Sequence, residues 1–290
     1  MVNRLLLRLI PEVATVGKAE LILNPCDPVV SSAIALGIYE VEEVLFFRQV
    51  IGTSKVFMDV GANIGLYTTL AIHAMPTDAM IIALEPHHRS FELLQSNVNR
   101  NRVLRGSDAP RVVLIPKAAT ARAGNYELRL NPDNSGDNRL YRGTFQGRLE
   151  NWPTEHVSGV TLDEVCEELS IEQVDFVKLD VQGYEHHVIQ GAKMTLSRSQ
   201  QVVLMTEFWP KGLVEAGSHP HEYLKLLRTL GFVIYEMRSK LKGKLEITHV
   251  RDDDALIHKL PGRKYANLVA VKSAAKLEQI RQATHCRTSP

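Results

Sequence analysis

The sequence contains few cysteines and no closely spaced pair of them. Three occur among 290 residues, at Cys26, Cys166 and Cys286, and none belongs to a C-x-x-C pattern. An odd number of widely separated cysteines argues against a disulfide framework and against a zinc site built on cysteine pairs. This usage favours a reducing compartment, so we expect a cytoplasmic protein.

An excess of charge and long apolar runs are also lacking. The 34 basic residues nearly balance the 33 acidic ones, so composition provides no electrostatic argument for a nucleic-acid partner. Residues 1–13 are leucine-rich but are interrupted by Arg8, and a membrane-spanning helix needs about 18 apolar residues. We expect no transmembrane segment; contact of residues 1–13 with a membrane surface stays an alternative. The 44% of hydrophobic residues is typical of a globular protein with a full core.

The most informative stretch is residues 55–65, KVFMDVGANIG, which combine a short apolar strand, an acid (Asp59) and a glycine-rich turn that opens a helix. Residues 81–86, IIALEP, supply the next strand, which ends in Glu85. Glycine lets the backbone approach a ligand, and a carboxylate at the second strand's end accepts hydrogen bonds from ribose hydroxyls. The pattern therefore predicts an adenosine pocket.

The turn itself, G-A-N-I-G, differs from the G-x-G-x-x-G pattern of dinucleotide-binding proteins. That pattern places a pyrophosphate on the helix N-terminus, where Asn63 would project its side chain into the space needed. The turn therefore disfavours a nicotinamide cofactor.

Apolar segments predict seven strands, near residues 56, 80, 112, 175, 202, 233 and 268, with helices between the early ones. We expect an α/β fold: a Rossmann-like, seven-stranded, mostly parallel sheet with a terminal antiparallel strand and helices on both faces. The helix after Pro86 should end in the asparagine-rich residues 97–101. Residues 51–275 would form the domain, with an N-terminal extension (1–50) packed on its core and a polar tail (276–290).

Four predicted strands end in acids, namely Asp59, Glu85, Asp180 and Glu207. The carboxyl ends of parallel strands lie at one edge of a sheet, so these side chains should face one crevice. Any one of them could instead be an ordinary helix N-cap. Four such acids beside a glycine turn favour a binding site.

Residues 131–153 are rich in Asn, Asp, Ser and Gly, and this composition predicts a loop. Long loops inside compact domains are usually functional or disordered. We interpret this loop as a lid over the substrate, and its candidate substrate contacts are Arg139, Tyr141, Arg142 and Trp152. A surface insertion is the alternative.

Residues 174–192, VDFVKLDVQGYEHHVIQGA, together with DVGANIG and the Glu85 strand, resemble the FkbM-type methyltransferases, a family of class I S-adenosylmethionine-dependent enzymes. The resemblance covers residues 56–207. Its most specific matches are Asp180, Val181, Gly183, Glu185, Gly191 and Ala192. The family usually has Glu at the position of Gln182, which puts the role of that side chain in doubt. Residues 134–140 resemble the family's N-S-G-like patch.

The resemblance implies S-adenosylmethionine as cofactor and O-methylation of a hydroxyl on a small natural-product or sugar-containing acceptor. It implies that the amino-acid and ribose portion of the cofactor contacts Asp59, Gly61, Asn63 and Gly65. It further implies that Glu85 binds the ribose hydroxyls, that Ala118 borders the adenine, and that Asp180 lies near the sulfonium and the incoming nucleophile.

A hydroxyl nucleophile gains from a base that accepts its proton. Asp180 is the first candidate for this role, and Glu207 and Glu185 are the second. His87 and His88 have no third ligand at metal-binding spacing and are expected to flank the adenosine pocket, so we predict no metal site. His186 and His187 begin the next helix, where at least one must point away from the crevice, so we do not rank either with the carboxylates as a base. A divalent ion between Asp180 and Glu207 stays an alternative.

Two other functions stay open. One is N-methylation of a nucleic acid or protein, but the N-P-P-[FY] or D-P-P-Y stretch of amino-methylating nucleic-acid enzymes does not follow the fourth strand, where Val-Gln-Gly succeeds Asp180. The other is a non-catalytic nucleoside-binding module. The sequence does not name the acceptor or the oligomeric state.

Overall fold

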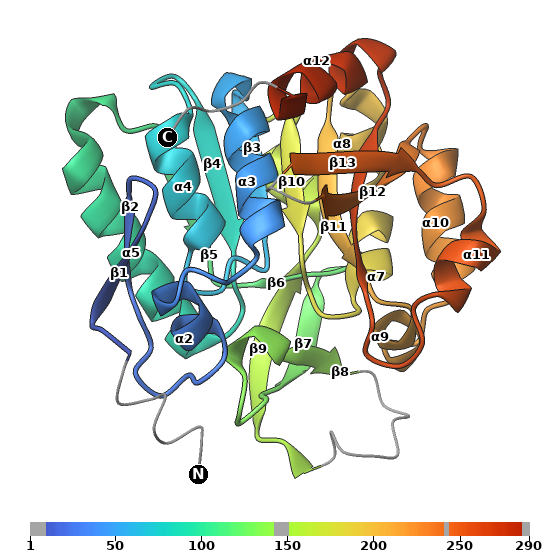
Figure 1. Cartoon of the computed structure of the whole chain (residues 1–290). Coiled ribbons are helices and arrows are strands. Elements are labelled where there is room, and N and C mark those ends of the chain that lie inside the picture. Colours follow the sequence, from blue (N-terminus) through green and yellow to red (C-terminus); the bar gives the residue numbers. More distant parts are fainter. Residues whose placement is uncertain (1–9, 142–150, 241–243, 286–290) are drawn as a thin grey trace.

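The centre of the protein is an eight-stranded sheet in a computed structural model that describes residues 10–141, 151–240 and 244–285 (Figure 1). The strand order is β13-β12-β14-β11-β10-β3-β4-β5. In chain order the strands are β3 (Val56–Val60), β4 (Met80–Leu84), β5 (Arg111–Ile115), β10 (Phe176–Leu179), β11 (Val203–Phe208), β12 (Val233–Lys240), β13 (Lys244–His249) and β14 (Ala266–Val271). This confirms the expected α/β fold with a mostly parallel sheet.

The antiparallel part of the sheet is larger than predicted. β14, the last strand of the chain, is antiparallel as expected and pairs with both β11 and β12. An eighth strand, β13, pairs with β12 at the edge. In its sequence, KLEITH, two apolar side chains, Leu245 and Ile247, pack on the core and alternate with polar ones. A helix, α11 (Asp253–His258), separates β13 from β14.

Helices cover both faces of the sheet (Figure 1). Side chains of a strand alternate between faces, and accordingly Phe57 packs on one side while Met58 and Val60 pack on the other. The Phe57 side carries α2 (Val30–Ala35), α3 (Val41–Val50), α4 (Leu66–Ala74), α5 (His88–Arg105) and α12 (Ala274–His285). The opposite side carries α6 (Leu162–Glu168), α7 (Glu185–Gln190), α8 (Lys193–Arg198), α9 (Pro210–Glu215), α10 (Pro220–Thr229) and α11.

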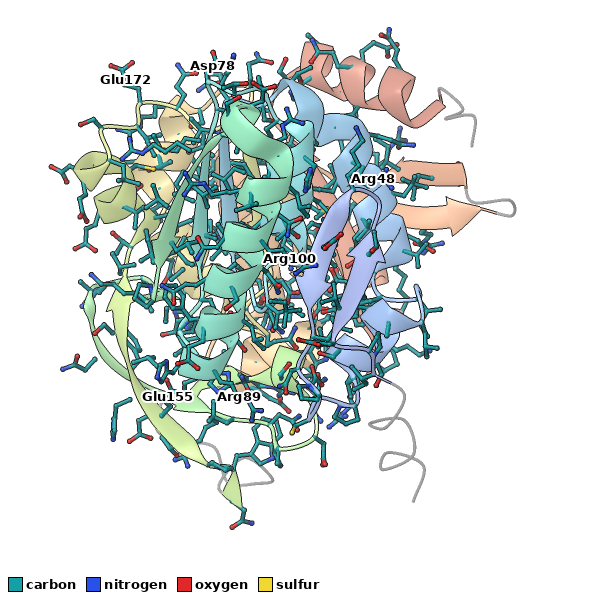
Figure 2. All side chains as sticks on the ribbon, turned by 90° about the vertical axis from the view of Figure 1, so that its left-hand side faces the viewer. Arg48, Asp78, Arg89, Arg100, Glu155 and Glu172 are labelled. Atoms are coloured by element: carbon teal, nitrogen blue, oxygen red, sulfur yellow. The ribbon has the colours of Figure 1, made fainter. Side chains whose placement is uncertain are left out.

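The hairpin of β1 (Val13–Val16) and β2 (Ala19–Ile22) lies along α5 (Figure 2). Two buried asparagines of α5 hold it: Asn97 Oδ1 accepts the Ile22 N–H at 2.6 Å, and Asn101 Oδ1 accepts the Glu20 N–H at 3.0 Å. The prediction that the helix ends at residues 97–101 was therefore wrong. These amides bind the hairpin backbone across the interface, and α5 continues to Arg105.

Residues before β3 also pack on the central sheet. The Phe47 ring of α3 lies 5.0 Å from the Phe57 ring of β3 and 5.3 Å from the Phe176 ring of β10, between centroids. This packing brings the start of α3 to the carboxyl edge of the sheet. Residues 1–9, which include most of the leucine-rich opening, lie outside the described part.

A second sheet of four strands, in the order β6-β9-β7-β8, lies beyond the carboxyl edge of the parallel strands (Figure 1). Its strands are β6 (Ala118–Ala119), β7 (Gly124–Arg129), β8 (Arg139–Tyr141) and β9 (Thr154–Val160). Part of the predicted loop 131–153 is thus a short 3₁₀ turn (Ser135–Asp137) and a strand. The candidate contact Arg142 lies outside the described residues. Across the described ranges, no helix has the length and apolar character needed to cross a bilayer.

Candidate functional site

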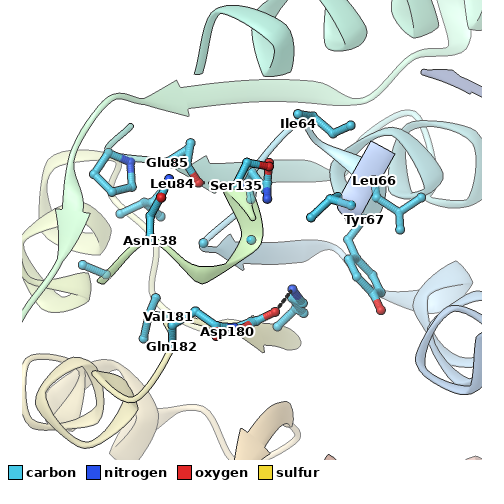
Figure 3. A pocket seen from close by; sticks show the side chains of 18 of the residues that line it. Ile64, Leu66, Tyr67, Leu84, Glu85, Ser135, Asn138, Asp180, Val181 and Gln182 are labelled. Atoms are coloured by element: carbon cyan, nitrogen blue, oxygen red, sulfur yellow. Dashed lines mark hydrogen bonds and ion pairs between the residues drawn. The ribbon is translucent and has the colours of Figure 1, made fainter. Parts of the chain in front are cut away.

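A cavity with about 830 Å³ of empty space, its open mouth included, lies between the carboxyl ends of β3, β4 and β10 and the four-stranded sheet (Figure 3). Five of the predicted site residues line it: Gly61, Asn63, Glu85, Ala118 and Asp180. The strand ends therefore converge as the sequence predicted, but not all of the predicted acids reach this space.

Gly61 is required by the close approach of two strand ends. Its φ is +82°, a conformation that side chains rarely adopt, and a Cβ atom there would lie 1.9 Å from the backbone oxygen of Asp180. Gly65 lies outside the cavity, at the N-cap of α4. A Cβ atom at Gly65 would lie 2.6 Å from Leu94 Cδ1, so this glycine serves the packing of α4 on α5.

Glu85 and Asn63 form a connected part of the cavity wall. The Asn63 N–H donates to Glu85 Oε2 at 2.8 Å, and the His87 N–H donates to Oε1 at 2.9 Å. Burial raises the pKa of Glu85 from 4.5 to about 7, although both backbone donors oppose the shift. Asn63 Oδ1 is buried and has no hydrogen-bond partner within the described chain, which leaves an acceptor available at the cavity.

Asp180 is held from two sides at the end of β10. Gln182 Nε2 donates to its Oδ1 at 2.7 Å, and Lys178 Nζ donates to its Oδ2 at 3.0 Å. The side-chain amide of Gln182 can donate this hydrogen bond to Asp180. A glutamate, which the FkbM-type sequences usually have at this position, could donate it only when protonated. Two donors thus fix one carboxylate at the cavity wall.

The sequence interpretation missed Lys178, although its position two residues before Asp180 on one strand face was readable. Its ammonium lies 4.7 Å from the centroid of the Tyr67 ring. Burial acts to lower the pKa of Lys178, but the carboxylates of Asp180, Glu40 and Asp59 prevail and raise it. Lys178 therefore stays protonated and cannot be a base at neutral pH.

Asp59 is fully buried and does not line the cavity. Its Oδ2 accepts a hydrogen bond from Thr68 Oγ1 at 2.6 Å, which ties the end of β3 to α4. Its Oδ1 has no hydrogen-bond partner among the residues described, and burial raises its pKa. The predicted contact of Asp59 with a cofactor stays a prediction.

Glu185 is also buried and does not line the cavity. Its Oε1 accepts the N–H groups of Val181 and Gly183 at 3.1 and 3.2 Å, so it supports the turn that presents Gln182. Burial raises its pKa to about 7. His187 on the same helix contacts the Ala216 carbonyl oxygen at 3.0 Å, away from the cavity.

A second cavity, of about 330 Å³, adjoins the first and shares with it Glu40, Tyr67, Lys178 and Asp180. Glu207 lines this second cavity, so of the candidate bases only Asp180 faces both spaces. The pKa of Glu207 is raised well above its usual value by burial and by the charges of Asp180 and Glu185. Among the described residues, no three potential metal ligands are grouped closely enough to hold a metal ion.

Glu40 is the second site residue that the sequence interpretation missed. It precedes α3 with a φ of +45°, which is uncommon for a residue other than glycine. Its Oε2 accepts a hydrogen bond from the Tyr67 hydroxyl at 2.6 Å. Because Glu40 lies outside every motif of the sheet, no sequence signal could have placed it here.

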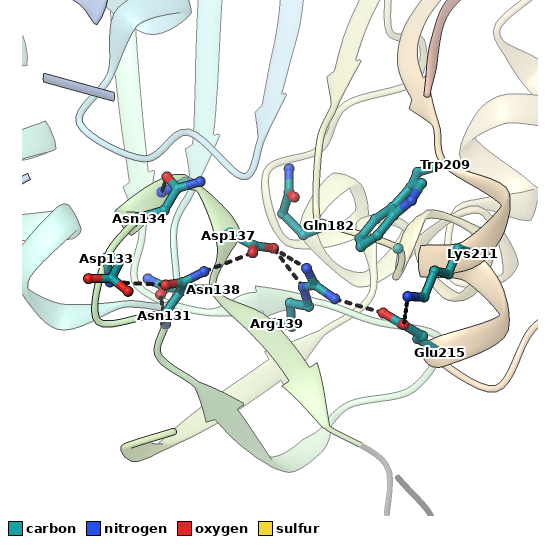
Figure 4. Close-up of polar contacts among 12 residues, drawn as sticks. Asn131, Asp133, Asn134, Asp137, Asn138, Arg139, Gln182, Trp209, Lys211 and Glu215 are labelled. Atoms are coloured by element: carbon teal, nitrogen blue, oxygen red, sulfur yellow. Dashed lines mark hydrogen bonds and ion pairs between the residues drawn. The ribbon is translucent and has the colours of Figure 1, made fainter. Parts of the chain in front are cut away.

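The 3₁₀ turn and β8 close one side of the first cavity with Ser135, Gly136, Asn138 and Leu140. Arg139 holds this segment through two carboxylates (Figure 4): its Nε donates to Asp137 Oδ1 at 2.6 Å, and its Nη1 donates to Glu215 Oε2 of α9 at 2.8 Å. The guanidinium also lies 4.5 Å from the Trp209 ring centroid. The candidate acceptor contact Arg139 is thus engaged in fastening the segment to α9.

The sequence profile of the methyltransferase FkbM domain matches residues 59–234, more than half of the chain. The chain belongs to the FkbM methyltransferase family. Its cofactor is S-adenosylmethionine, as the sequence resemblance implied.

Two curated relatives of this FkbM methyltransferase are each 26% identical to it. The hexuronic acid methyltransferase AglP of Haloferax volcanii matches over 70% of this chain and 69% of its own length. The 2-O-methyltransferase NoeI of Sinorhizobium fredii matches over 61% of this chain and 73% of its own length. A solved FkbM methyltransferase from Methylobacillus flagellatus KT has a TM-score of 0.44 at 12% identity, covering 93% of this chain and 59% of that one.

The first cavity fits the cofactor of the FkbM family on two observations. Asn63 offers an unpartnered buried acceptor, and Glu85 presents a carboxyl group. These groups match the ribose hydroxyls and the amino group of S-adenosylmethionine, which are hydrogen-bond donors.

Glu85 should make cofactor binding by this FkbM methyltransferase depend on pH. Its carboxyl group ionises as the pH rises through about 7, and the ionised form is the better acceptor for ribose hydroxyls. We expect affinity for S-adenosylhomocysteine to increase between about pH 6 and pH 8, by no more than about tenfold per pH unit. Calorimetric titration across this range measures the effect.

The Glu85→Gln variant should show weaker binding and a flat pH profile, while Glu92→Gln, an exposed residue of α5, should keep the wild-type profile. An affinity of the wild-type protein that is constant across this range would contradict the role given to Glu85.

Replacing Arg139 of the FkbM methyltransferase with methionine should loosen the segment that it holds. Asp137, whose side chain is only 11% exposed, would lose its cation, and Glu215, which is 14% exposed, would keep only Lys211 at 3.4 Å. Removal of one partner of a buried ion pair costs roughly 3–5 kcal/mol. We expect a lower free energy of unfolding in urea and weaker cofactor binding. Arg102→Met, an exposed position on α5, is the control, and equal effects of the two variants would refute the fastening role.

Proposed function

We propose that this FkbM methyltransferase transfers the methyl group of S-adenosylmethionine to a hydroxyl of a small natural-product or sugar-containing acceptor. The observation that carries the proposal is the position of Asp180, whose carboxylate borders both cavities. The names of the relatives, a hexuronic acid methyltransferase and a 2-O-methyltransferase, support this acceptor class.

In this proposal the first cavity holds the cofactor, which when bound supplies a methyl group activated by a positive sulfur. Glu85 accepts hydrogen bonds from the ribose hydroxyls, Asn63 and Gly61 contact the amino-acid and ribose portion, and Ala118 borders the adenine. Positioning supplies much of the rate in such a displacement, because it converts a bimolecular step into one between held groups.

Asp180 in this proposal accepts the proton of the acceptor hydroxyl. Lys178 holds one oxygen of Asp180 in place, since its ammonium donates to Oδ2 at 3.0 Å. Gln182 fixes the other oxygen and so orients the base. Glu207 lines the second cavity, where it can bind the acceptor, whereas Glu185 supports the turn beside the base.

Transfer of a labelled methyl group from S-adenosylmethionine to a panel of hydroxylated acceptors tests the proposal, with the product analysed by mass spectrometry. We expect an O-methyl ether. A product methylated on nitrogen would replace this proposal with the N-methyltransferase alternative. Binding of S-adenosylmethionine without transfer to any acceptor or cell extract would favour a non-catalytic nucleoside-binding module.

A further inference from the structure

Four of the eleven residues that line the second cavity lie outside the residues that match the family profile. Glu40 and Glu43 come from the start of α3, and Tyr265 and Asn267 come from the region of β14. The Asn267 side-chain amide donates a hydrogen bond to Glu43, which joins these two distant segments across the cavity. One side of the cavity is therefore contributed by unmatched segments, while the other residues of the lining, Lys178, Asp180 and Glu207 among them, belong to the matched range.

The lining of the second cavity is strongly asymmetric in charge. Four carboxyl groups line it, those of Glu40, Glu43, Asp180 and Glu207, and Lys178 is the one basic side chain among the described lining residues. That ammonium already donates to Asp180. An anionic ligand would therefore meet four acids without an uncommitted cation, whereas an ammonium group would meet acids on several sides.

The raised pKa values of two of these acids agree with the excess of carboxyl groups in the cavity. Burial and the neighbouring charges of Glu40 and Glu42 raise the pKa of Glu43 to about 7, and the pKa of Glu207 is raised well above its usual value. Like charges in one desolvated space disfavour each other's ionised forms, and a cation placed between them removes that penalty.

The uncharged walls suit a polyhydroxylated ring. Tyr67 and Tyr265 supply aromatic surface, and the Asn267 amide, which donates to Glu43, adds a polar group beside the acids. Carboxylates and amides offer the acceptors and donors that sugar hydroxyl groups need.

We propose that the second cavity is the acceptor compartment and that it selects a sugar bearing an amino group near the reacting hydroxyl, binds a neutral sugar less well, and rejects a uronic acid. The inference rests on the proposed function and departs from the acceptor named for the hexuronic acid methyltransferase relative. The selection comes from Glu43 and Glu207 at the walls, with Asp180 at the reacting end.

Three matched probes test the inference: methyl glucosaminide, methyl glucoside and methyl glucuronide, titrated by calorimetry into the protein saturated with S-adenosylhomocysteine. We expect affinity to fall in that order, with at least about tenfold between the first and the last. Equal affinities, a reversed order, or no binding of the glucosaminide would overturn the inference.

Variants of the lining residues test whether the order of glycoside affinities depends on the second cavity. Glu43→Gln and Glu207→Gln, alone and together, should reduce the preference for the glucosaminide over the glucuronide, while the exposed Glu172→Gln should leave it intact. Binding of S-adenosylhomocysteine, measured in each variant, shows that the fold and the first cavity persist. A preference unchanged in the double variant would refute the assignment.

Failure of the inference and failure of the proposed function are distinguishable in the same titrations. If S-adenosylhomocysteine does not bind, the proposed function fails. If it binds and the glycosides rank otherwise, the acceptor inference alone fails.

Discussion

Replacing Asp180 with asparagine is expected to lower kcat by roughly 10²- to 10⁴-fold, the usual contribution of a general base. Asparagine has nearly the same shape and can still contact Lys178 and Gln182, but its amide does not accept a proton at neutral pH. Affinity for S-adenosylmethionine should change little, because Glu85 and Asn63 are the residues proposed to contact the ribose and the amino-acid portion. Labelled-methyl transfer and calorimetry measure the two quantities separately.

Asp78→Asn is a suitable control, since Asp78 is an exposed acid that pairs with Lys55 far from the cavities. This control should keep the wild-type kcat. Full turnover by Asp180→Asn would show that the base assignment is wrong and would direct attention to Glu207.

Replacing Gly61 with alanine is expected to abolish cofactor binding and to destabilise the fold. The new Cβ atom would lie 1.9 Å from the Asp180 backbone oxygen, so the ends of β3 and β10 would have to separate. The left-handed backbone at φ +82° adds about 1–2 kcal/mol of its own. We expect no detectable heat of binding with S-adenosylhomocysteine and a clearly lower urea midpoint.

Gly37→Ala separates the two causes. Gly37 has a φ of +68°, but a Cβ atom there would meet no other atom within 4 Å. This variant should show the backbone cost alone, about 1–2 kcal/mol, and unchanged binding. If Gly61→Ala were as stable as Gly37→Ala and bound the cofactor, the close approach of the strand ends at Gly61 would matter neither for stability nor for cofactor binding.

The parts of the fold predicted correctly are those with strong local signals. The strand, glycine turn and helix around Gly61 are encoded within one short stretch, and so is the acid that follows β10. The positions of β13 and β14 depend on pairing between distant strands, which a polar edge sequence and the order of strands along the chain do not reveal.

The candidate site was predicted in the same uneven way. Glu85 and Asp180 face the first cavity because they follow strands whose ends meet there. Asp59 lies within β3 and Glu185 begins α7, and their carboxyl groups turn into the interior and bind Thr68 and the 181–183 turn. Strand-end position fixes the edge at which an acid lies, but side-chain direction depends on packing that the sequence does not display.

The position of β14 has a consequence for how this protein reaches its native state. β14 is the last strand to leave the ribosome, yet it occupies the space between β11 and β12. Until it arrives, both neighbours present unpaired edges, which are templates for association with other chains. Completion of the sheet therefore depends on long-range pairing, which is slow and exposes folding intermediates to aggregation. The same late step delivers Asn267 to Glu43, so the second cavity can form only after the sheet has closed.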